Sequence, residues 1–300
     1  MRFRGYIALL ALLLTCPFSG QAGLSFAEKV DSLKNILSRM RAAQTDAEVD
    51  IQNEYFKQLL ERTISDPAAM EYGFAEMKTL GSLISPDKEF RIFNWNIERK
   101  DGSFRYFAYI VLPGRLKNKV IEITHNTGLI KGKSETEVYD QRKWYGALYY
   151  KIIPVEHRGK TIYTLLGWDG NGAFSNKRII ESMEIRGKRV RFGIPIFKTD
   201  KGVARRMILE HAQDITVALR YENRKRDHMI VYDHLSPKAE QLEGMYEQYV
   251  PDGTYDAFTY DKKEELWILE LDFEASNPEE LIERPYNDPN DPNNPNNIRQ

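Results

Sequence analysis

The 300-residue sequence predicts a mainly β fold, an antiparallel meander of short strands preceded by an N-terminal helical hairpin. Apolar residues recur at helical spacing in the first part of the chain, and from about Phe90 they alternate as in strands. The repeated helices that the crossovers of a parallel sheet would require are missing from the sequence. Whether the strands form an irregular barrel, a sandwich or a propeller-like body stays open.

Residues 1–22 are typical of a secretory signal peptide. Two arginines form a basic start, residues 6–15 are an apolar run, and residues 20–22 offer small side chains for cleavage. The apolar run is too short for a membrane-spanning helix, which needs about 20 residues, and no later run is long enough. We therefore expect export to the periplasm or the extracellular space, with no transmembrane span and a mature chain that begins near Gly23.

Cys16 offers a second route to the envelope, and it is the only cysteine in the chain. It follows an apolar run that faintly resembles the lipobox of bacterial lipoproteins, but Thr15 and Pro17 depart from that pattern. Lipid anchoring through Cys16 is therefore the minority alternative to plain secretion. Cleavage after Ala22 would leave the mature chain without disulfides or thiol chemistry.

The charge balance excludes one class of partner. When the two arginines of the signal segment are taken from the 43 basic residues, 41 remain against 44 acidic ones, a net charge of −3. Such a chain lacks the basic footprint of a nucleic-acid-binding protein. We expect no nucleic acid partner.

Residues 23–85 are expected to form a helical arm. Five apolar residues recur at helical spacing in residues 26–43, and Thr45 or Asp46 suits the N-cap of a second helix. Residues 65–67, Ser-Asp-Pro, would end that helix. We expect the apolar stripe of this hairpin to pack on the main body, and the alternative is a docking arm for a partner.

Residues 86–274 are expected to form the β-rich body, and residues 275–300 a disordered tail. Asp101-Gly102 and residues 157–160 each lie between strand-like runs and predict hairpins. The end of the chain is rich in Asn, Asp and Pro and has almost nothing apolar to bury.

Residues 167–172, Gly-Trp-Asp-Gly-Asn-Gly, form the most distinctive stretch and follow an apolar strand. Glycine reaches backbone angles that other residues avoid, and Asp or Asn bonds its own backbone, so a shaped turn is expected. Trp168 is predicted to be buried on the face of Ile162 and Leu166 if the strand alternation continues. Asp169 and Asn171 would shape the turn, and calcium held by their oxygen atoms is the less favoured alternative.

Asp233 and His234 are further candidate residues, on a predicted strand near the end of the body. Asp233, Asp252 and Asp256 could meet Asp169 as a carboxylate pair for glycoside hydrolysis, which needs two carboxyl groups about 5 to 10 Å apart. The favoured role of these aspartates is to cap turns, and the favoured role of His234 is a structural hydrogen bond.

Common catalytic signatures are missing from the sequence. It contains no nucleophile elbow, phosphate loop, zinc pair or dinucleotide fingerprint, and its five histidines show no metal-ligand spacing. The catalytic residues, if there are any, stay unassigned, and we expect neither a metal centre nor a cofactor apart from the calcium alternative.

Four segments together resemble an uncharacterised family of exported bacterial proteins, over most of residues 30–270. The segments are residues 163–171 (YTLLGWDGN), 192–197 (FGIPIF), 233–235 (DHL) and 251–255 (PDGTY). The resemblance implies export and a single β-rich body, and it implies no activity.

Two function classes remain. The leading hypothesis is a non-enzymatic envelope or secreted protein that binds another envelope protein or a glycan. The competing hypothesis is a hydrolase of glycan or peptidoglycan that uses aspartates near residues 167–172. A cleft with two facing carboxylates would favour the hydrolase.

Overall fold

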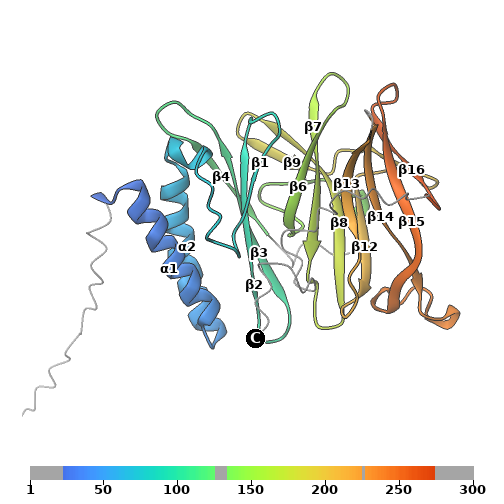
Figure 1. The fold of residues 1–300 in the computed structure, drawn as a ribbon, viewed down its shortest axis with the longest axis horizontal. Helices are drawn as coiled ribbons and strands as arrows, with labels where there is room; N and C mark the ends of the chain where they lie inside the picture. Colours follow the sequence, from blue (N-terminus) through green and yellow to red (C-terminus); the bar gives the residue numbers. More distant parts are fainter. Residues whose placement is uncertain (1–22, 126–133, 225–226, 274–300) are drawn as a thin grey trace, which may run out of the picture.

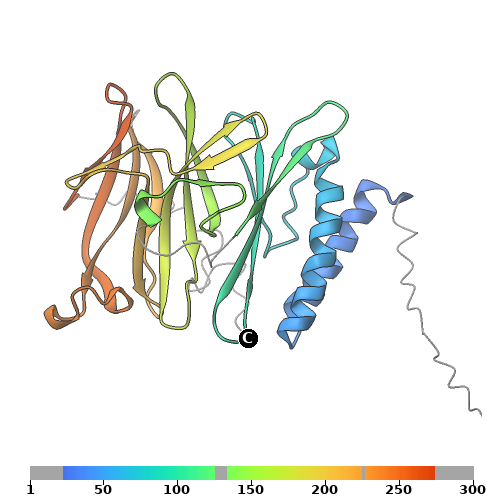
Figure 2. The ribbon, with the colours of Figure 1, turned by 180° about the vertical axis from the view of Figure 1, so that it is seen from behind.

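The structure is a computed structural model that describes residues 23–125, 134–224 and 227–273. Two N-terminal helices and three β-sheets are stacked as successive layers, from the helices at one end to the C-terminal strands at the other (Figure 1). The view from behind shows the same order (Figure 2). The predicted mainly β fold with an N-terminal helical hairpin is confirmed. No sheet closes into a barrel within the described residues, so the stack is nearest to the predicted sandwich.

The helical layer consists of α1 (Phe26–Ala42) and α2 (Asp46–Ile64), followed by the short 3₁₀ helix η2 (Pro67–Met70). Both helices begin at a capping box, in which Ser25 pairs with Glu28 and Thr45 with Glu48. Each box satisfies backbone N–H groups that a helix start leaves open, which explains why the helices begin where they do.

The first sheet contains β1 (Gly81–Ile84), β2 (Arg91–Glu98), β3 (Phe104–Leu112) and β4 (Lys119–Thr124), in that order. One of its faces packs on the helices. Trp95 lies edge-on to Phe56 of α2, with the ring centroids 5.2 Å apart, and its indole N–H donates to Asn53 Oδ1 at 2.8 Å. The helical hairpin thus packs on the body, as the first alternative predicts, and β1 within residues 23–85 joins the sheet.

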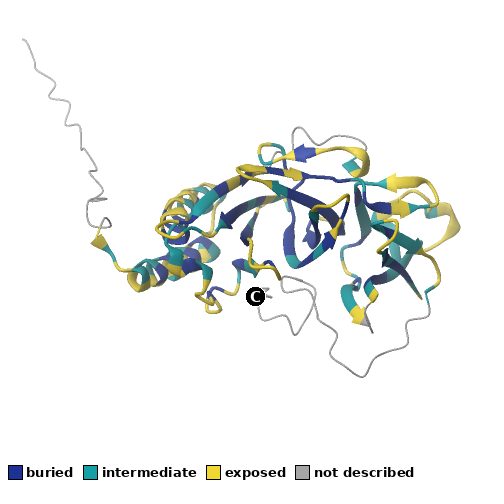
Figure 3. Ribbon diagram, turned by 90° about the horizontal axis from the view of Figure 1, so that it is seen from above, coloured by how far each residue is buried: buried dark blue, intermediate teal, exposed yellow. Residues whose placement is uncertain are grey.

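The central sheet is buried on both faces. It contains β5 (Tyr139–Asp140), β6 (Leu148–Glu156), β7 (Thr161–Asp169), β8 (Ser175–Arg186), β9 (Arg189–Phe192) and β12 (Arg206–Ala212). Leu165 packs toward the first sheet and Leu166 toward the third, and neither is exposed. Seen from above, buried residues fill the middle of the stack while exposed residues lie on its outer surfaces (Figure 3). Burial on both faces explains why β7 reads as a nearly continuous apolar run.

The third sheet contains β10 (Phe197–Thr199), β11 (Gly202–Ala204), β13 (Leu219–Arg224), β14 (Asp227–Pro237), β15 (Tyr249–Asp261) and β16 (Leu266–Glu270). Trp267 anchors this sheet to the central one, because its buried indole N–H donates to Thr164 Oγ1 of β7 at 2.9 Å. Three short 3₁₀ helices complete the described chain: η4 (Ser134–Thr136), η5 (Glu240–Leu242) and η6 (Tyr246–Gln248).

Several predictions fall on residues outside the described ranges. The signal segment 1–22, with Cys16, and the tail 275–300 belong to this group, so the structure leaves both as predictions. Within the described residues, no helix combines the length and the apolar character that a membrane crossing requires.

Candidate functional site

The turn after β7 has the shape that the sequence predicts, but a different residue takes the unusual backbone angle. Asn171 has φ 50°, whereas Gly170 does not adopt a positive φ. Gly170 is needed for space, because a Cβ atom built there would lie 2.4 Å from Phe104 Cε2. Gly170 therefore contributes to the turn through the close approach of an aromatic ring and not through an unusual backbone angle.

Trp168 is buried, as predicted, with 2% of its surface exposed. The face is not the predicted one. Ile162 and Leu166 pack between the central and third sheets, whereas Trp168 belongs to the cluster between the first and central sheets, where its ring lies edge-on to Phe104 at 5.5 Å. The strand alternation is thus broken just before the turn.

Asp169 is buried at the end of β7 and accepts hydrogen bonds on both carboxyl oxygens. Tyr106 of β3 and the backbone N–H of Asn171 donate to Oδ1, each at 2.8 Å, and Tyr145 donates to Oδ2 at 3.2 Å. Burial raises the pKa of Asp169 above its ordinary value, although the hydrogen bonds from Asn171 and Tyr106 oppose that rise. The carboxyl group thereby joins the first sheet to the central sheet.

Asn171 connects this carboxyl group to a second one, Glu210 of β12. Its side-chain amide donates to Glu210 Oε1 at 3.1 Å, and its side-chain oxygen accepts from Lys177 Nζ at 2.8 Å. Ser175 also donates to Glu210, at 2.6 Å. Lys177 thus contacts the amide oxygen that the calcium alternative assigns to a cation, and that alternative stays a prediction.

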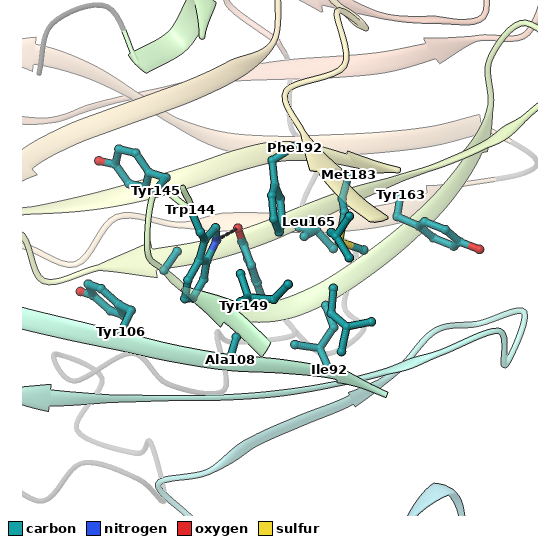
Figure 4. Packing of buried hydrophobic residues seen from close by; sticks show 14 of the residues in the cluster. Ile92, Tyr106, Ala108, Trp144, Tyr145, Tyr149, Tyr163, Leu165, Met183 and Phe192 are labelled. Carbon is teal, nitrogen blue, oxygen red and sulfur yellow. Dashed lines mark hydrogen bonds between the residues drawn. The ribbon is translucent and has the colours of Figure 1, made fainter. Parts of the chain in front are cut away.

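A buried ion pair joins β12 to β8. Arg206 of β12 donates to Glu181 of β8, and both side chains are completely buried. Glu181 also accepts from the Tyr149 hydroxyl, which accepts from Trp144 Nε1 at 2.8 Å (Figure 4). The Arg206 guanidinium lies 5.7 Å from the ring centroid of Tyr145, the residue that donates to Asp169. Glu181 and Arg206 were not among the sequence candidates.

Asp233 and His234 lie on β14, where they form a second group of hydrogen-bonded polar side chains. Asp233 Oδ2 accepts from the backbone N–H of Ala218 at 2.7 Å, and burial raises the pKa of Asp233. His234 Nδ1 lies 2.8 Å from Asp256 Oδ2. Burial alone would lower the pKa of His234, but the hydrogen bond and the charge of Asp256 raise it above its usual value.

One cavity of about 1160 Å³ brings most of these side chains together. Asp169, Asn171, Asp233 and His234 all line it, whereas buried Trp168 does not. Asp256 and Glu210 line the cavity too, while Asp252 is not part of its lining and accepts from Ser236 instead.

The residues of β12 that line the cavity pack on two different sides of the strand. Its residues Met207 and Leu209 pack against the cluster between the central and third sheets, whereas Ile208 packs against the cluster between the first and central sheets. Asp169 lies on the side of Tyr106 of the first sheet, and Asp233 and His234 come from the third sheet. The carboxyl group that shares partners with the Asp169 turn is therefore Glu210 rather than Asp233.

His125 also lines the cavity beside Asp169. Its Nδ1 accepts from the backbone N–H of Tyr106 at 3.1 Å, which leaves Nε2 to carry the hydrogen of the neutral ring. Burial, together with the charge of Arg105, lowers the pKa of His125 to about 4. Sequence reasoning did not select His125, Tyr106, Tyr145 or Glu210, because nothing in their local sequence marks them.

Within the described residues, no group of three or more His, Cys, Asp or Glu side chains could hold a metal ion. The comparisons with known proteins give no match, either to a protein-family model, to a curated protein or to a solved structure.

Proposed function

We propose that this chain is an exported binding protein of the cell envelope or the secreted fraction, and that the cavity around β12 is its binding site. The observation that carries the proposal is the meeting of Asp169 and Asn171, from the turn after β7, with Asp233 and His234, from β14, in one cavity. Its volume of about 1160 Å³ lies just above the range of common ligand pockets, about 300 to 1,000 Å³. The ligand classes that we propose are a segment of another envelope protein and a glycan.

The bonding of Asp169 favours binding over catalysis. Both of its oxygens already accept hydrogen bonds from this chain, two on Oδ1 and one on Oδ2. A general acid must present a proton to its substrate, and a nucleophile must present an unshared electron pair. Three of the four lone-pair sites of the carboxylate are already used, which leaves one on Oδ2 for either role. Holding the first and central sheets together is the simpler role.

One observation supports the hydrolase as a second candidate. Asp169, with its raised pKa, shares the cavity with Glu210, and Asn171 binds both groups. A protonated and an ionised carboxyl group side by side are what acid–base hydrolysis of a glycan uses. Release of soluble fragments from dye-labelled peptidoglycan by the purified protein, and its loss in a folded Asp169→Asn variant, would establish this candidate over the binding function.

Binding is tested with a variant that fills the mouth of the cavity. Val203 lines the cavity and is 47% exposed, so Val203→Trp should block it without disturbing the core. Leu116→Trp is the matched control, because Leu116 is exposed and lies outside this cavity. We expect soluble muropeptides or synthetic peptides to bind the unmodified protein and the control in calorimetric titrations, and to bind Val203→Trp at least about tenfold more weakly. Equal binding by all three proteins would place the site elsewhere.

Export is tested separately on the protein from the cells that make it. We expect intact mass and N-terminal sequencing to give a mature chain that begins at or near Gly23, in the periplasmic or extracellular fraction. A lipidated Cys16 as the first residue would instead anchor the protein to a membrane.

A further inference from the structure

Strand β12 lies at an edge of the central sheet along the cavity. Its one strand partner among the described residues is β8, with Arg206 opposite Glu181 and Ala212 opposite Ser175. Met207, Ile208, Leu209 and Glu210 all line the cavity and are only half-buried, although the residues of β8 opposite Ile208 and Met207 are fully buried. The middle of β12 therefore presents a strand edge to the cavity.

The hydrogen-bond pattern shows which residues form that edge. The backbone N–H of Gln213, just beyond β12, donates to Phe174 O on the β8 side at 3.2 Å. In an antiparallel ladder the backbone N–H and C=O groups of successive residues point alternately toward and away from the partner strand. Met207 and Leu209 therefore point these groups toward β8, as Gln213 does, whereas Ile208 and Glu210 point theirs away from β8. These outward groups are a template for one more strand.

The two faces beside this edge differ in chemistry. Met207 and Leu209 lie on the apolar side that faces the third sheet, whereas Glu210 lies near Asn171 on the side of Asp169. Six carboxyl side chains line the whole cavity, against two lysines. One of these lysines, Lys177, lies 3.5 Å from Glu210, and four carboxyl groups remain in excess. A strand added at β12 would place its alternate side chains on these two faces.

We infer that the ligand of this cavity is an extended cationic peptide segment of a partner protein, which adds to the outer edge of β12 as a further strand. Its backbone bonds the outward groups of Ile208 and Glu210, its apolar side chains lie beside Met207 and Leu209, and its basic side chains lie beside Glu210. The inference rests on the proposed binding function and selects the peptide over the glycan.

The probe is an eight-residue synthetic peptide of alternating lysine and valine, labelled with a fluorophore and titrated by anisotropy. Two derivatives carry backbone N-methyl groups, one on every valine and the other on every lysine, so that each derivative lacks the N–H groups of one edge. We expect one derivative to bind at least about tenfold more weakly than the parent peptide and the other within about threefold. Equal affinity of the two derivatives would overturn strand addition.

Charge is tested with a peptide in which glutamate replaces every lysine. We expect this peptide to bind at least about tenfold more weakly than the lysine peptide, because like charges then meet across the strand pair. Affinity for the lysine peptide should also fall as salt is raised from about 20 mM to about 300 mM. Tighter binding of the glutamate peptide would overturn the choice of a cationic ligand.

Two proline variants test the edge itself. Ile208→Pro removes an N–H that points into the cavity, which an edge strand tolerates, whereas Met207→Pro removes one that bonds β8. We expect Ile208→Pro to stay folded and to lose peptide binding, Ile208→Val to bind normally, and Met207→Pro to melt at a much lower temperature. A folded Ile208→Pro variant with unchanged peptide affinity would overturn the inference. If Ile208→Pro does not fold, the comparison of the two N-methylated peptides still tests strand addition.

Different results would overturn the proposed binding function of the cavity and strand addition at β12. In one case the protein binds muropeptides, Val203→Trp blocks that binding, and the lysine–valine peptide does not bind. This result would overturn strand addition but would leave the proposed binding function standing. In the other case no ligand binds in a way that Val203→Trp weakens. This result would overturn both the binding function of the cavity and strand addition.

Discussion

The hydroxyl group of Tyr106 connects two layers of the molecule at one point. It donates to Asp169 Oδ1 at 2.8 Å and accepts from the backbone N–H of Gly170 at 2.7 Å. Tyr106 comes from β3 of the first sheet and Asp169 from the end of β7 in the central sheet. The turn that borders the cavity is thus held by a residue 63 positions away in the chain.

The first prediction concerns the charge of Asp169. Burial raises its pKa in the folded protein, so the folded state keeps the proton over a pH range in which the unfolded chain has released it. The contribution of this group to stability is therefore lost as the pH rises from the ordinary pKa of an aspartate through the raised one. Asp169→Asn removes the titration, and the melting temperature of this variant should rise relative to the unmodified protein as the pH is raised above about 4.

At low pH the Asp169→Asn variant should differ from the unmodified protein by about 1 kcal/mol or less in the free energy of unfolding. The amide keeps an oxygen for the Asn171 N–H, and the Tyr145 hydroxyl can accept where it now donates. Calorimetric melting at a series of pH values measures both effects. A difference in melting temperature that does not change with pH would show that Asp169 is not the titrating group.

Local patterns in the sequence were sufficient for most of the elements. The helical stripe and the cap at Thr45 locate the hairpin, and the alternation from Phe90 onward locates the later strands, whereas β1 lies within the segment that was expected to be helical. Burial of Trp168 could also be predicted, because a large aromatic residue at the end of an apolar strand is usually buried together with that strand. The face of the sheet on which Trp168 packs could not be predicted, because the alternation of side chains along the strand stops at the turn.

The environment of the site could not be predicted, because it depends on sheet order. Glu210 reaches the Asp169 turn only because β12 pairs with the same side of β8 as β9 does, and no local signal specifies that neighbour. Tyr106 and Tyr145 look like ordinary core aromatics in the sequence. What the sequence does mark is the turn itself, and this turn borders the cavity.

The second prediction is that Gly170 is required for space rather than for its backbone angle. Gly170→Ala should lower the free energy of unfolding by about 1 to 3 kcal/mol, because the new Cβ atom meets the Phe104 ring. Gly172→Ala is the matched control, with nothing within 4 Å of its Cβ position, and should cost less than about 0.5 kcal/mol. Urea denaturation measures both, and equal losses would show that the ring is not the cause.

The third prediction concerns the buried pair of Glu181 and Arg206. Arg206→Met leaves the Glu181 carboxylate buried without its cation, and should cost about 3 to 5 kcal/mol in the free energy of unfolding. The double variant Glu181→Leu with Arg206→Met removes both charges, and should recover most of that loss. If the double variant is as unstable as the sum of the single changes in denaturation experiments, the loss comes from packing rather than from the unpaired charge.

The fourth prediction compares two aromatic residues that lie close together in the chain but differ in burial. Trp168 is 2% exposed and packs on Phe104, whereas Phe174 is 80% exposed. Trp168→Ala should lower the free energy of unfolding by about 3 to 5 kcal/mol, because it leaves a cavity between the first and central sheets. Phe174→Ala should cost less than about 0.5 kcal/mol. Trp168→Phe should lose less than Trp168→Ala, since the indole N–H has no hydrogen-bond partner among the described residues. Urea denaturation of the three variants gives the comparison, and a Trp168→Ala variant as stable as Phe174→Ala would contradict the role of Trp168 in the core.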